Sequence, residues 1–127
     1  MVNKTKILIV DDDVNICEIL KDILEEKGYE VTTVNDGGSA IDCARNSAQD
    51  VILLDMRLPD MNGLETYRVI RKFDSAVLVA FMTVYKYEWK RCEEEAMKEG
   101  AFACIYKPFN VEEVFDILEE SRHRKKK

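Results

Sequence analysis

The chain has 127 residues, of which 46% are hydrophobic and 35% charged, and its formal net charge is -6 at pH 7. This length is enough for one domain whose core needs no metal or disulfide, and the negative charge argues against a surface that binds nucleic acid or anionic membranes. The four cysteines form no Cys-x-x-Cys pair, and the first apolar run has only four residues, too few for a signal peptide or a membrane span. We therefore expect a cytoplasmic protein.

Short apolar runs alternate with segments of helical periodicity along the whole chain. The apolar runs, which we interpret as strands, are residues 7–10, 31–34, 51–55, 76–82 and 101–106. Helices are predicted from Val14 to a stop at Gly28, around residues 40–44 and 64–70, over residues 87–99, and after Asn110, which forms a capping-box pair with Glu113. Such alternation predicts an α/β fold with one doubly wound, five-stranded parallel sheet in the flavodoxin-like order 2-1-3-4-5.

The run from Val51 to Leu54 is apolar at every position, as expected for a strand buried on both faces of a parallel sheet. Asp55 follows it directly and therefore lies at the carboxyl end of the strand. In open α/β sheets, ligands bind in the crevice beyond these ends, so Asp55 is a candidate site residue. Taken alone, it could equally be a turn or capping aspartate.

The predicted strand order brings Asp11, Asp12, Asp55, Thr83 and Lys107 to one edge of the sheet. Neighbouring carboxylates at about 4 Å repel by roughly 4 kcal/mol per pair at an effective dielectric near 20, so a cation is needed there. Mg²⁺ suits such oxygen ligands. The Thr83 hydroxyl and the Lys107 ammonium could stabilise the oxygens of a phosphoryl group in transfer, with Asp55 as the nucleophile.

Each of these residues also has a plainer interpretation. Asp11 or Asp12 could simply cap the first helix, and Thr83 could simply end its strand. Lys107 could extend from the sheet edge into solvent, and Pro108 could open the last helix. Their joint occurrence at the ends of separate strands favours the functional interpretation.

Over residues 6–121 the sequence resembles the receiver domain of two-component response regulators. The residues that carry the resemblance are Ile7–Asp12, Leu53–Pro59 with Met61–Glu65, Met82 and Thr83, Gly100–Phe102, and Lys107–Phe109. We expect residues 1–121 to form this domain. The basic run over residues 122–127 is then a tail, the start of a linker, or the charged end of the last helix.

The resemblance implies a phosphoacceptor site with a bound Mg²⁺. Asp55 takes a phosphoryl group from the phosphohistidine of a histidine kinase. Asp12 and Asp55 ligate Mg²⁺, Asp11 assists through water, and the backbone carbonyl of Arg57 is a further ligand. The resemblance assigns no site role to Asp13, which we expect to be a cap or exposed.

The resemblance also implies movements and partners. Thr83 swings toward the phosphoryl group, Lys107 pairs with it, and the bond from Lys107 to Pro108 is cis. The expected partners are a sensor histidine kinase or a histidine phosphotransfer protein, an output domain beyond Lys127, and a second copy that docks on the fourth helix, last strand and last helix. We expect no membrane contact, no direct contact with nucleic acid, and no catalysis beyond the domain's own phosphoryl transfer and dephosphorylation.

Two features depart from the family pattern. Cys104 stands where many relatives have an aromatic residue that turns inward, three positions before the lysine. The segment 84–89 is slightly longer than usual and lacks a glycine. We therefore expect the switch to involve Thr83, Tyr85 and residues 87–89 at the start of the fourth helix, and to change the surface made by that helix, the last strand and the last helix.

Three other interpretations compete with a receiver. Asp11 to Val14 also matches the first motif of haloacid-dehalogenase-type phosphatases, with Asp11 as nucleophile and Asp13 as general acid. The chain is too short for such an enzyme, and only one helix follows Lys107. A flavodoxin-like nucleotide binder would need a phosphate-binding loop where three aspartates stand. A receiver fold that serves protein contact alone is disfavoured by the intact acidic set.

Overall fold

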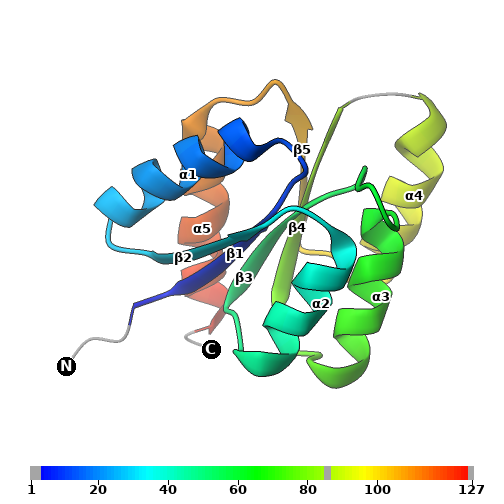
Figure 1. Cartoon of the computed structure of the whole chain (residues 1–127), viewed down its shortest axis with the longest axis horizontal. Coiled ribbons are helices and arrows are strands. Elements are labelled where there is room, and N and C mark those ends of the chain that lie inside the picture. Colours follow the sequence, from blue (N-terminus) through cyan, green and yellow to red (C-terminus); the bar gives the residue numbers. More distant parts are fainter. Residues whose placement is uncertain (1–3, 85–86, 126–127) are drawn as a thin grey trace.

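The structure is a computed structural model that describes residues 4–84 and 87–125. Within these ranges, five strands form one parallel sheet in the order β2-β1-β3-β4-β5, with a helix after each strand. The predicted fold class and strand order are therefore confirmed (Figure 1). None of the helices in these two ranges combines the length and the apolar character that crossing a membrane requires.

The elements are short and regular. The strands are β1 (Lys6–Val10), β2 (Glu30–Val34), β3 (Val51–Asp55), β4 (Leu78–Val84) and β5 (Ala103–Lys107). The helices are α1 (Val14–Glu26), α2 (Gly37–Asn46), α3 (Gly63–Phe73), α4 (Tyr87–Lys98) and α5 (Val111–Lys125). The basic run that begins at Arg122 thus continues α5 as far as Lys125, whereas a domain boundary at residue 121 stays a prediction.

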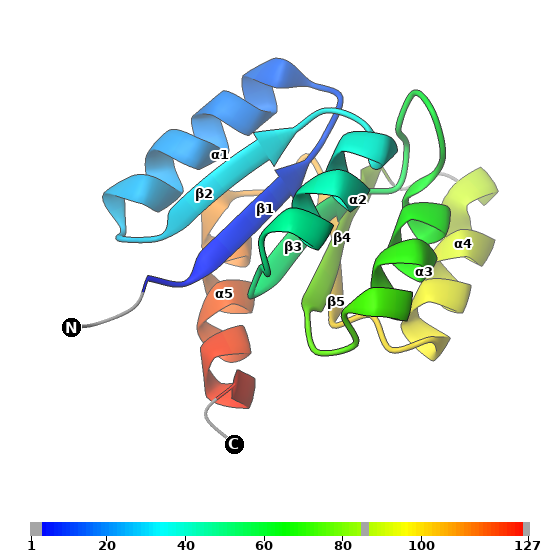
Figure 2. The ribbon, with the colours of Figure 1, turned by 60° about the horizontal axis from the view of Figure 1, so that its bottom comes forward.

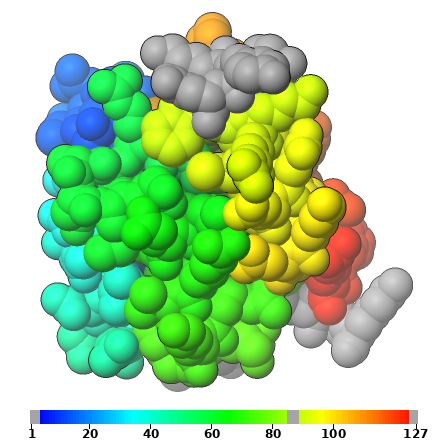
Figure 3. All heavy atoms as spheres, turned by 90° about the vertical axis from the view of Figure 1, so that its right-hand side faces the viewer, coloured from blue at the N-terminus to red at the C-terminus, as the bar shows by residue number. Residues whose placement is uncertain are grey.

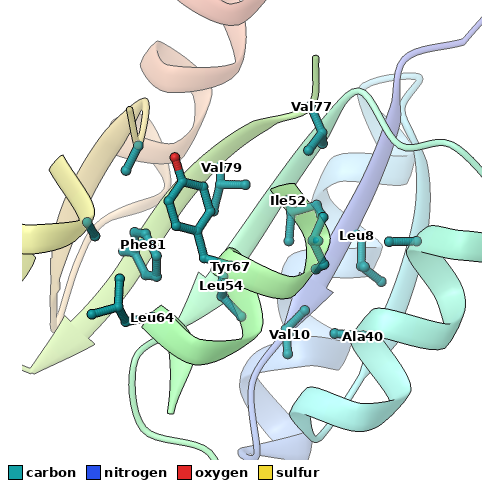
Figure 4. Close-up of a cluster of buried hydrophobic side chains, with 14 of the residues drawn as sticks. Leu8, Val10, Ala40, Ile52, Leu54, Leu64, Tyr67, Val77, Val79 and Phe81 are labelled. Atoms are coloured by element: carbon teal, nitrogen blue, oxygen red, sulfur yellow. The ribbon is translucent and has the colours of Figure 1, made fainter. Parts of the chain in front are cut away.

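The two layers of helices cover opposite faces of the sheet. Helices α1 and α5 lie on one face and α2, α3 and α4 on the other, as the two views in Figures 1 and 2 show. Each face has its own buried cluster, and β3 contributes alternate residues to both, which is why every position of β3 is buried. Figure 4 shows the cluster under α2 and α3, where the ring of Tyr67 packs edge-on against Phe81, with centroids 5.5 Å apart.

The strands β4 and β5 begin two residues later than predicted, because local hydrogen bonds hold the preceding residues in turns. The side chain of Asp74 accepts hydrogen bonds from the backbone N–H groups of Ala76 and Val77, at 3.1 and 3.2 Å. Ala101 instead completes the end of α4, where its N–H donates to the Ala96 carbonyl at 3.0 Å. β4 also continues past its predicted end at Met82, since Val84 still pairs with Lys107 of β5.

The start of α1 is capped by Asp13, whose side chain accepts hydrogen bonds from the N–H groups of Asn15 and Ile16, at 3.0 and 3.3 Å. The expectation that Asp13 is a cap is confirmed. Capping by Asp11 or Asp12, the plainer interpretation of these two residues, is wrong. Both acids are therefore left for another role at the sheet edge.

Candidate functional site

The acidic residues predicted from the sequence meet at the carboxyl edge of the sheet. One carboxylate oxygen from each of Asp11, Asp12 and Asp55 lies within 4.8 Å of the others. Asp11 follows β1 and Asp55 ends β3, and these neighbouring strands bring the two side chains together. Asp11 is fully buried, Asp55 is 5% exposed, and Asp12 is exposed to solvent. Such a set could hold a hard divalent cation and leave one side open to water.

Lys107, the last residue of β5, bridges two of these carboxylates. Its Nζ lies 2.6 Å from Oδ2 of Asp11 and 3.0 Å from Oδ2 of Asp55. Burial acts to lower the pKa of Lys107, but the hydrogen bonds to the two carboxylates outweigh it, and the pKa is raised. The peptide bond from Lys107 to Pro108 is cis, as the resemblance implies.

The pKa of Asp55 is raised from 3.8 to about 6, mainly by burial. The hydrogen bond from Lys107 opposes this rise, and the negative charge of Asp11 adds to it. A paired carboxylate usually has a lowered pKa, but here one ammonium is shared by two buried acids. The site therefore carries more negative charge than its own lysine can neutralise.

Backbone N–H groups fix the remaining oxygens of the two buried acids. The N–H of Asp13 donates to Oδ1 of Asp11 at 2.9 Å, and the N–H of Arg57 donates to Oδ1 of Asp55 at 3.1 Å. Each carboxylate thus has one oxygen on Lys107 and the other on the N–H two residues further along. This arrangement sets the orientation of both side chains.

Thr83 is buried in β4, next to the strand that carries Asp55, and is only 1% exposed. Its hydroxyl donates a hydrogen bond to the carbonyl of Val84 at 3.2 Å. In this structure the Thr83 hydroxyl is thus engaged with the backbone of its own strand.

The loop between β3 and α3 lies against the start of α2. Asp60 in this loop accepts hydrogen bonds from the N–H groups of Gly37 and Gly38, both at 2.8 Å. Gly63 closes the loop, and a Cβ added there would lie 2.5 Å from the Asp55 carbonyl oxygen. The contacts of Asp60 could not be predicted from the sequence, because nothing in the local pattern indicates which residues it meets.

On β5, Cys104 and Tyr106 point to the same face of the sheet, toward α4. Burial raises the pKa of the Cys104 thiol to about 12, with a further contribution from Glu93, so the thiol acts as a small apolar side chain. The hydroxyl of Tyr106 donates to the carboxylate of Glu93 on α4. The predicted switch residue Tyr85 lies outside the described residues.

The far end of α4 is fixed to α3 by polar contacts. The guanidinium of Arg68 lies 2.6 Å from Glu99 and 3.2 Å from Glu95. The carbonyl of Glu99 accepts hydrogen bonds from Arg71 at 2.8 Å and from the Tyr67 hydroxyl at 3.2 Å. Figure 3 shows the surfaces of α3 (green) and α4 (yellow) side by side.

An apolar groove of about 370 Å³ borders the acidic edge. It lies between α1, which contributes Ile16, Ile19 and Ile23, and the segment Lys107–Phe109. Ile19, on the α1 side of this groove, is 59% exposed. The groove brings apolar surface next to the lysine that contacts both buried acids.

Residues 7–119 match the family model of the response regulator receiver domain. The chain is a response regulator receiver domain. Receiver domains are the signalling domains of two-component systems, and histidine kinases phosphorylate these domains. The predicted family is therefore confirmed, in preference to a phosphatase with Asp11 as nucleophile.

Curated relatives differ in how much of their length this receiver domain covers. It is 35% identical over 115 residues to the transcriptional regulatory protein ZraR of Klebsiella oxytoca, covering 91% of this chain but 26% of ZraR. It is 32% identical to the sporulation initiation phosphotransferase F of Bacillus subtilis, covering 91% of both chains. The chain thus spans about a quarter of the one relative and nearly all of the other.

Solved structures agree with the fold. The CheY-like receiver domain protein from Methanospirillum hungatei has a TM-score of 0.91 and 31% identity, and the match covers 98% of both chains. The response regulator TrrA from Thermotoga maritima, solved in complex with Mg²⁺ and BeF, has a TM-score of 0.80 and 30% identity over 92% of this chain and 98% of that one.

Proposed function

We propose that Asp55 accepts a phosphoryl group from the phosphohistidine of a histidine kinase or a histidine phosphotransfer protein. The observation that carries the proposal is the position of Lys107, whose Nζ contacts both Asp11 and Asp55 at the carboxyl edge of the sheet. A cation placed there can stabilise the charge that develops on phosphoryl oxygens next to Asp55. The domain has no other substrate in this proposal and assists only its own phosphorylation and dephosphorylation.

Asp55 acts as the nucleophile in its ionised form. Its pKa of about 6 leaves the carboxylate mostly ionised at pH 7. The N–H of Arg57 holds Oδ1, while Oδ2 lies on Lys107. Because Oδ2 and the ammonium are already in contact, a phosphoryl group attached there has the positive charge beside it. The Thr83 hydroxyl, once it leaves the Val84 carbonyl, donates to a phosphoryl oxygen.

The donor set fits Mg²⁺, with Asp11, Asp12, Asp55 and the Arg57 carbonyl as the residues that would hold it. Three carboxylates face a single ammonium, so a divalent cation would balance the charge of the cluster. When bound, Mg²⁺ neutralises charge on the phosphoryl oxygens and orients them. The exposed side chain of Asp12 leaves this edge accessible from solvent.

The donor protein docks on the apolar groove beside Lys107. A donor histidine must approach Asp55 from the carboxyl edge, and the exposed Ile19 of α1 and the segment Lys107–Phe109 lie directly beside that path. Apolar surface of this kind at the edge of a polar site is typical of protein contacts. A small phosphodonor needs no such surface.

Phosphorylation changes the surface formed by α4, β5 and α5. The hydroxyl bond from Thr83 to the phosphoryl group supplies the difference in contacts that favours the active state. Tyr106 adjoins Lys107 in sequence and bonds to Glu93, which connects the site to α4. The altered surface serves an output domain outside these residues, or a second copy of the domain.

Intact-mass measurement with acetyl phosphate and Mg²⁺ tests this function. We expect one added phosphoryl group on the wild type and none on Asp55→Asn. A mass gain that persists in Asp55→Asn but disappears in Asp11→Asn would instead support the phosphatase-like chemistry. No mass gain on the wild type with either acetyl phosphate or a kinase would contradict the proposal altogether.

A further inference from the structure

We propose that Asp60 is a positioning residue for the metal site: its carboxylate, bound across the start of α2, holds the loop that carries Arg57. The inference rests on the proposed function, because it concerns the backbone carbonyl of Arg57 as a ligand of Mg²⁺. Asp60 itself does not touch the acidic cluster in this proposal. It acts only through the loop.

Two different parts of the chain accept the hydrogen bonds of the backbone N–H groups in the first turn of α2. The N–H groups of Gly37 and Gly38 donate to the two oxygens of Asp60, both at 2.8 Å. Asp36, the helix cap, accepts two hydrogen bonds. Its side chain accepts one from the N–H of Ser39 at 2.7 Å, and its carbonyl accepts one from the N–H of Ala40 at 3.1 Å. Two of the four N–H groups that a helix start leaves unpaired thus bind a side chain from the loop between β3 and α3.

Besides these hydrogen bonds, the start of α2 is in close van der Waals contact with the segment around the loop between β3 and α3. A Cβ added at Gly37 would lie 2.5 Å from Cγ of Met61 and 2.7 Å from Oγ1 of Thr66. The Met61 side chain of the loop and the Thr66 side chain of α3 therefore lie directly against the start of α2, and a side chain at Gly37 would have to displace them. The N–H groups of Gly37 and Gly38 also lower the pKa of Asp60, so the carboxylate remains ionised at neutral pH.

Arg57 lies between this tether and a second anchor at the base of the loop. There the N–H of Gly63 donates to the Met56 carbonyl at 2.8 Å, and the N–H of Arg57 donates to Asp55 at 3.1 Å. Only Leu58 and Pro59 separate Arg57 from Asp60. With both ends of so short a segment fixed, the direction of the Arg57 carbonyl is fixed too. Without Asp60, one end is released.

The test compares Asp60→Ala with Asp36→Ala in the intact chain. Asp36→Ala removes a cap from the same helix but leaves the loop tether in place, so it controls for loss of helix stability. For each protein, the rise in thermal midpoint is measured against Mg²⁺ concentration, and the rate of phosphorylation by acetyl phosphate is measured over the same range. The first readout needs no activity.

In Asp60→Ala we expect the half-saturating Mg²⁺ concentration to rise about tenfold, as for loss of other groups that orient a metal ligand. The phosphorylation rate at saturating Mg²⁺ should stay near that of the wild type, because Lys107 and Asp55 are untouched. Asp36→Ala should keep the wild-type Mg²⁺ dependence. Asp60→Asn, which keeps one acceptor oxygen, should fall between these variants and replaces Asp60→Ala if that protein does not fold.

Equal Mg²⁺ dependence in the wild type and both Asp60 variants overturns the inference, and so does an equal shift in Asp36→Ala. In either case the wild type still responds to Mg²⁺, and the proposed function stands. If neither the thermal midpoint nor the phosphorylation rate of the wild type depends on Mg²⁺, the metal site itself is contradicted, and the role of Asp60 with it. The two failures are thus distinguishable.

Discussion

The ammonium of Lys107 lies 2.6 Å from Oδ2 of Asp11, a side chain with no exposed surface. Replacing Lys107 by Met keeps most of the apolar stem and removes the charge. We expect the free energy of unfolding in EDTA to fall by about 3 kcal/mol, because two buried acids lose their shared cation. Urea denaturation measures this loss, and Mg²⁺ should restore part of it.

The matched control for Lys107→Met is Arg91→Gln. Arg91 also pairs with a carboxylate, that of Glu95, but its side chain is 90% exposed. Its removal should change the free energy of unfolding by less than about 0.5 kcal/mol. Similar effects of both substitutions would contradict the view that Lys107 neutralises buried charge.

A second prediction concerns pH. The pKa of Asp55 is raised from 3.8 to about 6, so between these values the folded protein holds a proton that the unfolded chain has lost. The free energy of unfolding therefore contains a contribution that falls as pH rises from about 4 to 6, by up to about 3 kcal/mol. Asp55→Asn cannot ionise and lacks this contribution.

The measurement for the second prediction is the difference in unfolding free energy between the wild type and Asp55→Asn, followed from pH 4 to pH 7 in EDTA. The wild type should lose stability relative to the variant as pH rises. A difference that stays constant, or changes in the opposite direction, would show that Lys107 outweighs burial and lowers the pKa of Asp55.

A third prediction separates the two kinds of phosphodonor. Ile19→Glu adds a charge to the apolar groove, so it should slow phosphoryl transfer from a kinase by at least about tenfold, as expected when an apolar contact is lost from a docking surface. Transfer from acetyl phosphate should stay unchanged. Quenched-flow transfer from a purified kinase that phosphorylates the wild type, compared with intact mass for acetyl phosphate, measures both.

Met97→Glu is the control for the groove. Met97 is also a large exposed hydrophobic residue, 44% exposed, but it lies near the end of α4. It should leave both transfers unchanged. If Ile19→Glu slows phosphoryl transfer from acetyl phosphate as much as transfer from the kinase, the substitution has disturbed the site itself. Docking on the groove is then not supported.

The last prediction concerns the switch. Trp89 packs against the buried cluster under α4 and is the only tryptophan in the sequence. Its fluorescence should change when a beryllofluoride mimic and Mg²⁺ are added. Thr83→Ala and Tyr106→Phe should each reduce this change, because one removes the hydroxyl that binds the mimic and the other removes the bond to Glu93.

Cys104→Ala should leave most of the fluorescence change intact, because a thiol is too small to fill and vacate a cavity as an aromatic ring does. Hydrogen exchange over residues 87–94 provides an independent readout. A response that is lost in Cys104→Ala and kept in Thr83→Ala would make the cysteine part of the switch and would contradict the proposal.

The sheet order and the acidic edge could be predicted from the sequence because both depend on local patterns. Apolar runs and helical periodicity define the elements, and parallel order places Asp11, Asp55 and Lys107 at the same edge. The starts of β4 and β5 could not be predicted, because the Asp74 side chain and the end of α4 compete with strand pairing there.

Two other contacts, those of Asp60 and of Tyr106, could not be predicted from the sequence. Asp60 binds residues more than 20 positions away, and its partners are backbone N–H groups that every residue except proline carries. The bond between Tyr106 and Glu93 depends on how α4 lies against β5. No sequence motif indicates either contact, although both lie next to residues that the motifs identify.

The polar contacts that fix the end of α4 to α3 also determine how α4 can move. Glu99 and Glu95 are bound by Arg68, while the start of the helix at Tyr87 follows directly on the segment after Thr83. With 12 residues, α4 is about 18 Å long. A tilt of about 10° around its fixed end displaces the other end by about 3 Å, given a rise of about 1.5 Å per residue. Because the fixed end is at Glu99, such a tilt moves Tyr87 most, beside the segment that follows Thr83, and moves the residues near Glu95 least.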